Sequence, residues 1–245
     1  MTGPAARRPL VDRFGRLLRP ALVDRVERDH QQSARAFLRR RIVVAVTLVV
    51  GATLLGLSLS VDPTDPRFYP LTIALAATWV IGGVLSGPLH LGYMPFRGRL
   101  RRPVITPIAF GLATAVLFIV GALIVRQIPP LASLTDAVLD QARGRSLVLV
   151  ALITLINGIA EEIFFRGALF AAIGVRHPVV ISTVVYGLAT VASGNLMLVF
   201  AALTLGLLLG LQRRASGGIL GPILTHVTWS TTMLFVLPPL FSAVG

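Results

Sequence analysis

Long apolar runs, separated by short polar or basic segments, occupy the chain from Ile42 onward. A helix needs about 20 apolar residues to cross a bilayer, and about seven runs approach or exceed that length. They cover residues 42–60, 69–89, 104–125, 147–173, 179–193, 196–212 and 218–237. The fourth is longer than one crossing requires and the fifth is short. The pattern predicts an all-α fold, a polytopic transmembrane helical bundle of about seven spans.

The segments outside these runs differ in character. Residues 1–41 form a basic arm, which we expect on the cytoplasmic side. Its apolar residues recur at roughly helical spacing, which fits a helix on a membrane surface interrupted near Pro20; a solvated arm is the alternative. Residues 127–143 carry two aspartates and flanking arginines, which predicts a loop and a short interfacial helix rather than another crossing. Because no linker divides residues 42–245, we expect them to form one transmembrane domain.

Composition supports the membrane prediction. The chain is 55% hydrophobic and 13% charged, with no cysteine, so disulfides and thiolate chemistry are excluded. Its net charge of +13 comes from arginines beside the spans, where basic residues orient a membrane protein and contact anionic lipid, so nucleic acid is not an expected partner. The use of arginine without lysine indicates a GC-rich bacterial genome, and hence the bacterial plasma membrane.

The arginines also predict an orientation, because cytoplasmic loops carry an excess of basic residues. The inner side then holds the N-terminus and the clusters around Arg101, Arg176 and Arg213, whereas the loops containing Asp62 and Asp136 lie outside with the C-terminus.

Two adjacent carboxylates stand in the middle of the fourth run, in the sequence NGIAEEIFFRGALF. An ionised side chain in the hydrocarbon region costs several kcal/mol, about 2.5 or more, so Glu161 and Glu162 mark a buried functional site. Glu162 and Arg166 are four residues apart and share a helix face, which predicts an ion pair. Glu161 lies about 100° around the helix. We therefore expect a free Glu161 carboxylate, directed at a cavity and able to exchange a proton, although a purely structural role for all three residues is the alternative.

His226 is the one histidine well inside a predicted span. At about 1.5 Å per residue, it and Glu161 are placed at similar depths in the inner half of the membrane. This favours a shared site over a simple polar contact between helices.

Three short patterns lie within residues 145–237. Glu161, Glu162 and Arg166 form Glu-Glu-x-x-x-Arg, with Phe165 before and Gly167 after the arginine. The segment ISTVVYGLAT contains Tyr186 and Thr190, and His226 precedes Ser230 by four residues. These patterns resemble the CPBP intramembrane proteases, which are named for CAAX-protease and bacteriocin-processing members. That family has Glu-Glu-x-x-x-Arg, Phe-x-x-x-His and His-x-x-x-Asn, so the last two motifs are degenerate here.

The resemblance implies a glutamate-dependent endopeptidase that cleaves a membrane-associated or lipidated peptide. Glu161 would be the base that activates water, and His226 would hold water or the oxyanion. Glu162, Arg166, Thr190 and Ser230 would support them, with Ser230 at the position of the asparagine.

Thr190 conflicts with this function, because a hydroxyl cannot act as a base as imidazole does. A catalytically silent relative that binds a membrane partner or peptide is therefore the alternative, and a proton-coupled transporter is a third. No cofactor is identified from the sequence. A divalent metal has been proposed for the family, but one histidine and two glutamates remain here, and Arg166 is expected to occupy Glu162.

Overall fold

The computed structural model describes residues 18–26, 32–96, 98–143 and 145–242. Helices make up nearly all of its regular structure. Six helices of the described residues are long and apolar enough to cross a membrane. They are α2 (Ala34–Ser60), α3 (Phe68–Ser86), α4 (Ile105–Val125), the continuous helix Leu147–Ile173, α9 (Leu196–Ser216) and α10 (Leu220–Ser242). The predicted all-α, multi-pass membrane fold is confirmed.

The predicted fifth span is a shorter helix than a crossing needs. It is α8 (Pro178–Val191), whose 14 residues extend about 21 Å, whereas the hydrocarbon core is about 30 Å thick. The α8–α9 turn is bound to α5 (Pro129–Asp140), because the Asn195 side-chain amide donates a hydrogen bond to the Leu134 carbonyl. A short helix therefore suffices here, since α5 meets the turn. The predicted helix within residues 127–143 is confirmed as α5.

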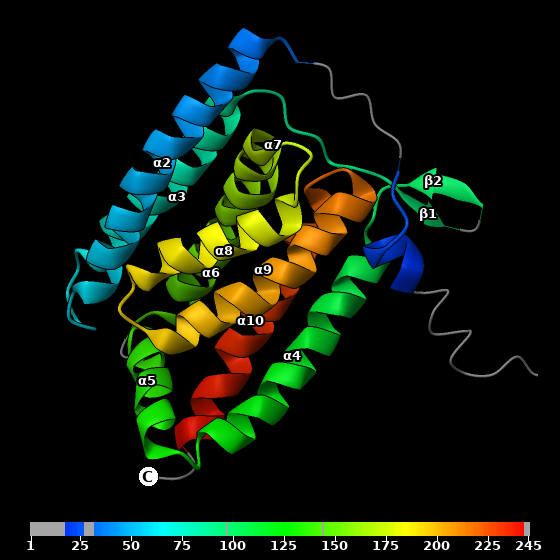
Figure 1. The fold of residues 1–245 in the computed structure, drawn as a ribbon. Coiled ribbons are helices and arrows are strands. Elements are labelled where there is room, and N and C mark those ends of the chain that lie inside the picture. The colour runs from blue at the N-terminus through cyan, green and yellow to red at the C-terminus, as the bar shows by residue number, and fades with distance from the viewer. Residues whose placement is uncertain (1–17, 27–31, 97, 144, 243–245) are drawn as a thin grey trace, which may run out of the picture.

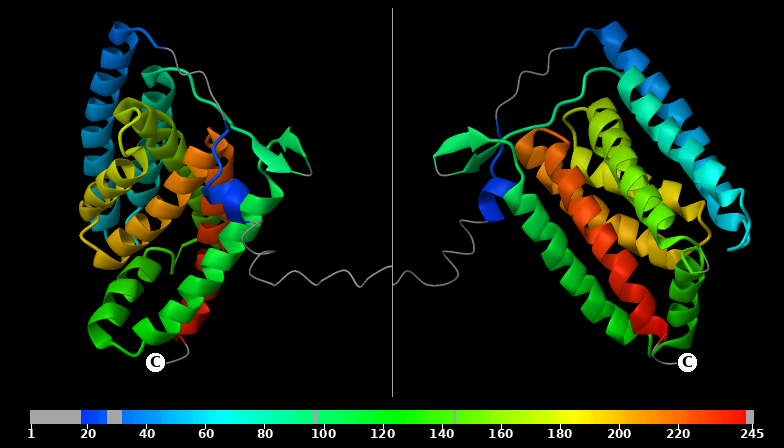
Figure 2. Two further views of the ribbon diagram at one scale, coloured as in Figure 1. Left: turned by 45° about the vertical axis from the view of Figure 1, so that its right-hand side comes forward. Right: turned by 180° about the vertical axis from the view of Figure 1, so that it is seen from behind.

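The helices form two outer pairs with the middle of the chain between them (Figure 1). α2 packs against α3, and α4 packs against α10. Between the pairs lie the helix Leu147–Ile173 and the α8–α9 hairpin, as the two further views also show (Figure 2). The first turn of α2 and the last turn of α10 lie at opposite ends of the bundle.

Close approach of α2 and α3 depends on Gly51. A Cβ atom at this position would lie 2.1 Å from the Trp79 ring. Trp79 in turn packs against Phe164 and Phe165, with ring centroids 4.6 and 5.1 Å apart. The glycine therefore allows the outer pair to support the helix that carries the glutamates.

Small residues on one face of α9 likewise allow this helix to approach α8 closely. A Cβ on Gly206 would meet Thr183 at 3.1 Å, and one on Gly210 would meet Val179 at 3.2 Å. The turn between the helices ends at Asn195, whose Oδ1 accepts from the backbone N–H groups of Met197 and Leu198 and so caps α9.

The helix Leu147–Ile173 changes its winding midway. It begins as α6 (Leu147–Glu162), widens into the π-helical segment η1 (Ile163–Leu169) and ends as α7 (Phe170–Ile173). Arg213 of α9 donates its Nε–H to the Arg166 carbonyl within this segment, at 2.6 Å. Single-turn π-helical widenings of this kind occur often at functional sites.

The end of the bundle near the start of α2 carries two further features. Strands β1 (Met94–Phe96) and β2 (Arg99–Arg101) form a small antiparallel hairpin with Pro95 opposite Leu100, which sequence reasoning missed. Residues 18–22 are helical through Pro20, so the described part of the arm shows no interruption there. The remainder of the predicted surface helix falls in residues 1–17, outside the described residues. α2 runs across residue 41, and the division of the chain at that point stays a prediction.

Candidate active site

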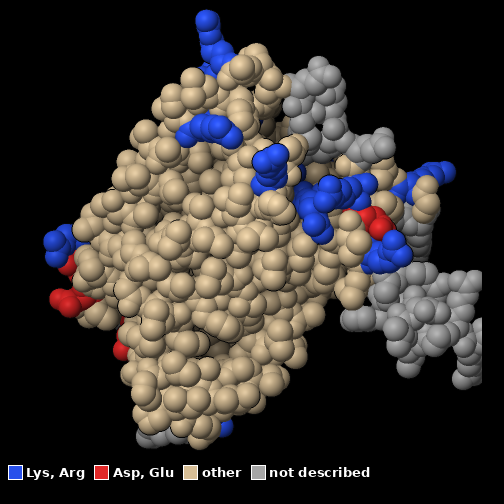
Figure 3. Space-filling view, in the orientation of Figure 1, with Lys and Arg blue, Asp and Glu red and all other residues tan. Residues whose placement is uncertain are grey.

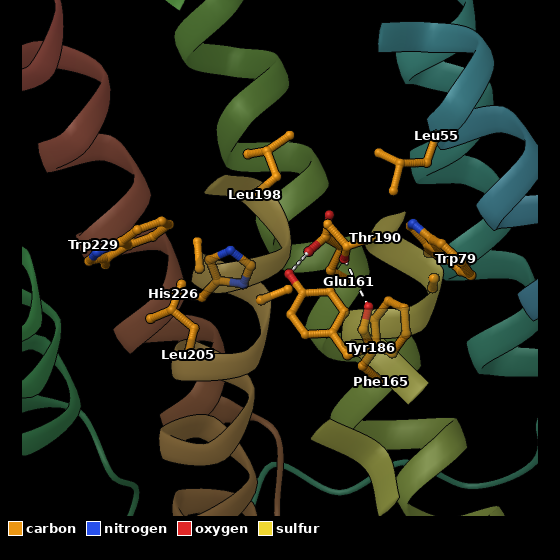
Figure 4. A pocket seen from close by; sticks show the side chains of 13 residues that line it. Leu55, Trp79, Glu161, Phe165, Tyr186, Thr190, Leu198, Leu205, His226 and Trp229 are labelled. Carbon is orange, nitrogen blue, oxygen red and sulfur yellow. Dashed lines mark hydrogen bonds between the residues drawn. The ribbon is translucent and has the colours of Figure 1, made fainter. Parts of the chain in front are cut away.

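A cavity of about 170 Å³ lies inside the bundle, and both Glu161 and His226 line it. Its walls are otherwise largely apolar and come from α2, α3, α8, α9, α10 and the helix of the glutamates (Figure 4). The apolar and aromatic lining residues are Leu55, Trp79, Phe165, Tyr186, Ala189, Leu198, Ala201, Ala202, Leu205 and Trp229. The expected meeting of Glu161 and His226 at one cavity is therefore present, although they are 65 residues apart in the chain.

Glu162 lies behind the cavity and holds two side chains at one oxygen. Its Oε1 accepts from Arg166 Nη1 at 2.8 Å, which is the ion pair that their spacing predicts. The same oxygen lies 2.8 Å from His226 Nδ1. Glu162 and Arg166 are 0% and 1% exposed, so this ion pair is fully buried. Spacing identified the first contact but not the second, because His226 comes from α10.

The cluster defines how His226 meets the cavity. An ionised Glu162 can only accept, so Nδ1 carries the hydrogen of that contact and the neutral ring then has its lone pair on Nε2. Nε2 makes no hydrogen bond to any described residue. It is consequently available to hold a water molecule in the cavity.

Glu161 makes a different contact. Its Oε2 accepts a hydrogen bond from the Tyr186 hydroxyl at 2.5 Å, and it forms no ion pair with a described residue (Figure 4). The prediction of a carboxylate directed at a cavity is thus met, but Glu161 is not free. From the sequence, Tyr186 was expected only to occupy the phenylalanine position of the second motif. A polar hydroxyl on a membrane helix, one turn from Thr190, was the available signal.

Thr190 lines the cavity, as its place in the motif predicts, but its hydroxyl is engaged elsewhere. It donates to the Tyr186 carbonyl of its own helix at 2.8 Å. Ser230 donates to the Val227 carbonyl at 3.3 Å and does not line the cavity. Neither residue therefore presents its proton to the space beside Glu161.

The described residues do not form a metal-binding set. No group of three or more His, Cys, Asp and Glu side chains among them is placed to hold an ion. Glu162 is not among the residues that line the cavity, and its Oε1 already contacts both Arg166 and His226. Glu161 therefore has no second carboxylate beside it in the cavity lining. The described residues therefore do not fit a divalent metal ion.

The arrangement supplies a proton acceptor and a water-holding group at a cavity with largely apolar walls. Glu161 has one oxygen bonded to Tyr186 and a second oxygen for another partner, whereas His226 is held in one orientation by Glu162. Electrostatic interactions in such a site are stronger than in water, because few solvent dipoles screen them. A carboxylate base and an oriented imidazole are suited to activating water for attack on a carbonyl group.

Comparison with known proteins finds a family match for the part of the chain that carries this site. Residues 143–232 match the protein family described as type II CAAX prenyl endopeptidase Rce1-like. The match includes Glu161, Glu162, Arg166, Thr190 and His226, together with Ser230. No curated protein and no solved structure matches the chain. Residues 143–232 are therefore similar to the Rce1-like family of type II CAAX prenyl endopeptidases, the same kind of protease that the motifs of the sequence resemble.

Proposed function

We propose that this protein is a glutamate-dependent intramembrane endopeptidase that hydrolyses a peptide bond in a membrane-associated, lipidated peptide. The observation that carries the proposal is the placement of Glu161 and His226 on one cavity with largely apolar walls. The apolar walls support a lipidated substrate, since they offer no charged group to a polar chain apart from the reacting residues.

In the proposed reaction, Glu161 acts as general base. The carboxylate takes a proton from water while the water oxygen bonds to the scissile carbonyl carbon, and the C=O electron pair moves onto oxygen. His226 Nε2 accepts from the same water and fixes its position. When the tetrahedral intermediate collapses, the C=O bond reforms, the C–N bond breaks, and the proton on Glu161 passes to the leaving amine. Glu162 and Arg166 act through His226 and touch no reacting atom.

We also propose that the protein lies in the bacterial plasma membrane with its N-terminus in the cytoplasm. The basic residues around α2, the hairpin and the end of α9 support this orientation.

The test is cleavage of a fluorogenic peptide that ends in a prenylated CAAX sequence, with the full chain reconstituted in liposomes. Glu161→Gln removes the base and retains an oxygen for the Tyr186 hydroxyl, so we expect activity to fall about 10²–10⁴-fold without unfolding. Asp136→Asn is the matched control, because it removes a carboxylate outside the cavity while Asp140 still pairs with Arg143. This control should retain wild-type activity.

Equal rates for wild type and Glu161→Gln would refute the catalytic proposal. The engaged hydroxyl of Thr190, at the motif position of a histidine, favours a silent binding protein as the second candidate. Saturable binding of the same peptide without cleavage would then support that function.

A further inference from the structure

We propose that Tyr186 is a further catalytic residue of this site. Its hydroxyl orients Glu161 in the resting protein and then donates a hydrogen bond to the substrate carbonyl oxygen as that oxygen becomes negatively charged. The inference rests on the proposed peptidase function and assigns a hydrogen-bond donor for the oxyanion that the hydroxyls of Thr190 and Ser230 do not supply.

The geometry around Tyr186 fixes its hydroxyl at the reacting carboxylate. The ring is 8% exposed and packs on Phe165 with centroids 4.5 Å apart. The Arg166 guanidinium lies 4.7 Å from its centroid. These contacts hold the ring while the hydroxyl reaches Glu161 Oε2 at 2.5 Å, within the lining of the cavity (Figure 4).

The neighbouring hydroxyls and the His226 ring are less suited to donate. A hydroxyl has one proton, and those of Thr190 and Ser230 are directed to carbonyls of their own helices. His226 directs Nδ1 to Glu162, so a neutral ring presents an acceptor at Nε2. A developing oxyanion needs donors, which makes the Tyr186 O–H the suitable hydroxyl beside Glu161.

Protonation of Glu161 allows the Tyr186 hydroxyl to change its hydrogen-bond acceptor. The resting carboxylate is a strong acceptor and holds the Tyr186 hydrogen. Once Glu161 has taken the proton of the attacking water, its oxygens are weaker acceptors and the new oxyanion is the stronger one. The hydrogen bond then moves to the oxyanion, and Tyr186 keeps its own proton throughout. All protons therefore balance as in the proposed hydrolysis, with Glu161 alone carrying the transferred one.

The first variant is Tyr186→Phe, which removes the hydroxyl and keeps the ring. Loss of one oxyanion donor typically costs about 10²–10³ in kcat. We expect a fall of that size in kcat with KM nearly unchanged, because the hydrogen bond to the substrate forms as the reaction proceeds. The thermal midpoint should stay close to that of wild type. Tyr93→Phe is the matched control, since Tyr93 is exposed and outside the cavity, and it should leave kcat unchanged.

The second test introduces Thr190→His into both wild type and Tyr186→Phe. Position 190 lies one helical turn along α8 from Tyr186. If an imidazole here supplies a donor at the same place, it should raise the activity of Tyr186→Phe at least tenfold and raise wild type much less. Such non-additivity is expected when two groups perform one task. A residue needed only for packing would not be rescued in this way.

The outcomes separate this inference from the proposed function. If wild type cleaves, Glu161→Gln does not, and Tyr186→Phe matches wild type in kcat, then the role of Tyr186 is wrong while the peptidase remains. If Tyr186→Phe loses activity only because its thermal midpoint collapses, with no rescue by Thr190→His, the inference is also overturned. Equal rates for wild type and Glu161→Gln would overturn both proposals.

Discussion

Glu162 holds the buried charges of the site together. Its Oε1 is shared by Arg166 and His226, and its Oε2 has no hydrogen-bond partner among the described residues. An enclosed carboxylate is stable only while a cation compensates it, because the interior solvates ions poorly. Arg166 supplies that charge, whereas Glu161 relies on a neutral hydroxyl and the cavity. The two adjacent glutamates therefore have different surroundings and are expected to respond differently to mutation.

Arg166→Ala should destabilise the fold strongly, because it leaves the Glu162 charge buried without a cation. Removing one partner of a buried ion pair typically costs about 3–5 kcal/mol. Thermal unfolding and SDS titration in detergent would measure the loss, with exposed Arg176→Ala as the control. Glu161→Gln should leave the midpoint nearly unchanged. A larger loss for Glu161→Gln than for Arg166→Ala would contradict this division.

At the scale of helices, close packing places the polar residues at the cavity. α2 and α3 approach through Gly51, and the Trp79 that fills the gap also supports Phe164 and Phe165. The π-helical turn that follows Glu162 exposes the Arg166 carbonyl to Arg213. Errors in this packing would therefore displace the glutamate helix relative to α8 and α10.

Gly51→Ala tests the support from α2 and α3. The added methyl group would overlap the Trp79 ring, and overpacking a core typically costs about 1–3 kcal/mol. Gly121→Ala in α4 is the matched control, since a Cβ there meets nothing within 4 Å. We expect the control to be neutral or slightly stabilising, because alanine has the higher helix propensity. Equal thermal midpoints for the two variants would show that Trp79 moves aside without cost.

Across the whole molecule, charge is distributed unevenly between the two ends of the bundle. Most of the arginines visible in Figure 3 lie toward the end where α2 begins and α9 finishes. Asp62, Asp65, Asp136 and Asp140 belong to the loops and short helix at the opposite end. Because basic residues favour the cytoplasmic side, this distribution predicts one orientation of the bundle.

The absence of cysteine makes this orientation simple to measure. Leu100→Cys lies in the hairpin and Pro63→Cys in the loop after α2, and both positions are exposed. In intact cells, an impermeant maleimide should label Pro63→Cys, whereas Leu100→Cys should react only after permeabilisation. The reverse pattern would invert the orientation, and labelling of both in intact cells would mean that the hairpin is not cytoplasmic.

Sequence alone determined the features that depend on neighbours along one helix. Apolar runs of sufficient length predict membrane helices because the backbone must bond internally in lipid. The spacing of Glu162 and Arg166 predicts their contact because residues four apart share a helix face. The short length of α8 was also visible, although the reason it can be short, a contact between Asn195 and α5, was not.

Tertiary structure decided which side chains meet across helices. Tyr186 reaches Glu161 over 25 residues of sequence and His226 reaches Glu162 over 64. Both contacts depend on helix rotation, on the approach allowed by small residues and on the π-helical turn, and helical periodicity specifies none of these. The sequence therefore predicted a buried pair of carboxylates, but only the packed bundle showed that one is held by a tyrosine and the other holds the histidine.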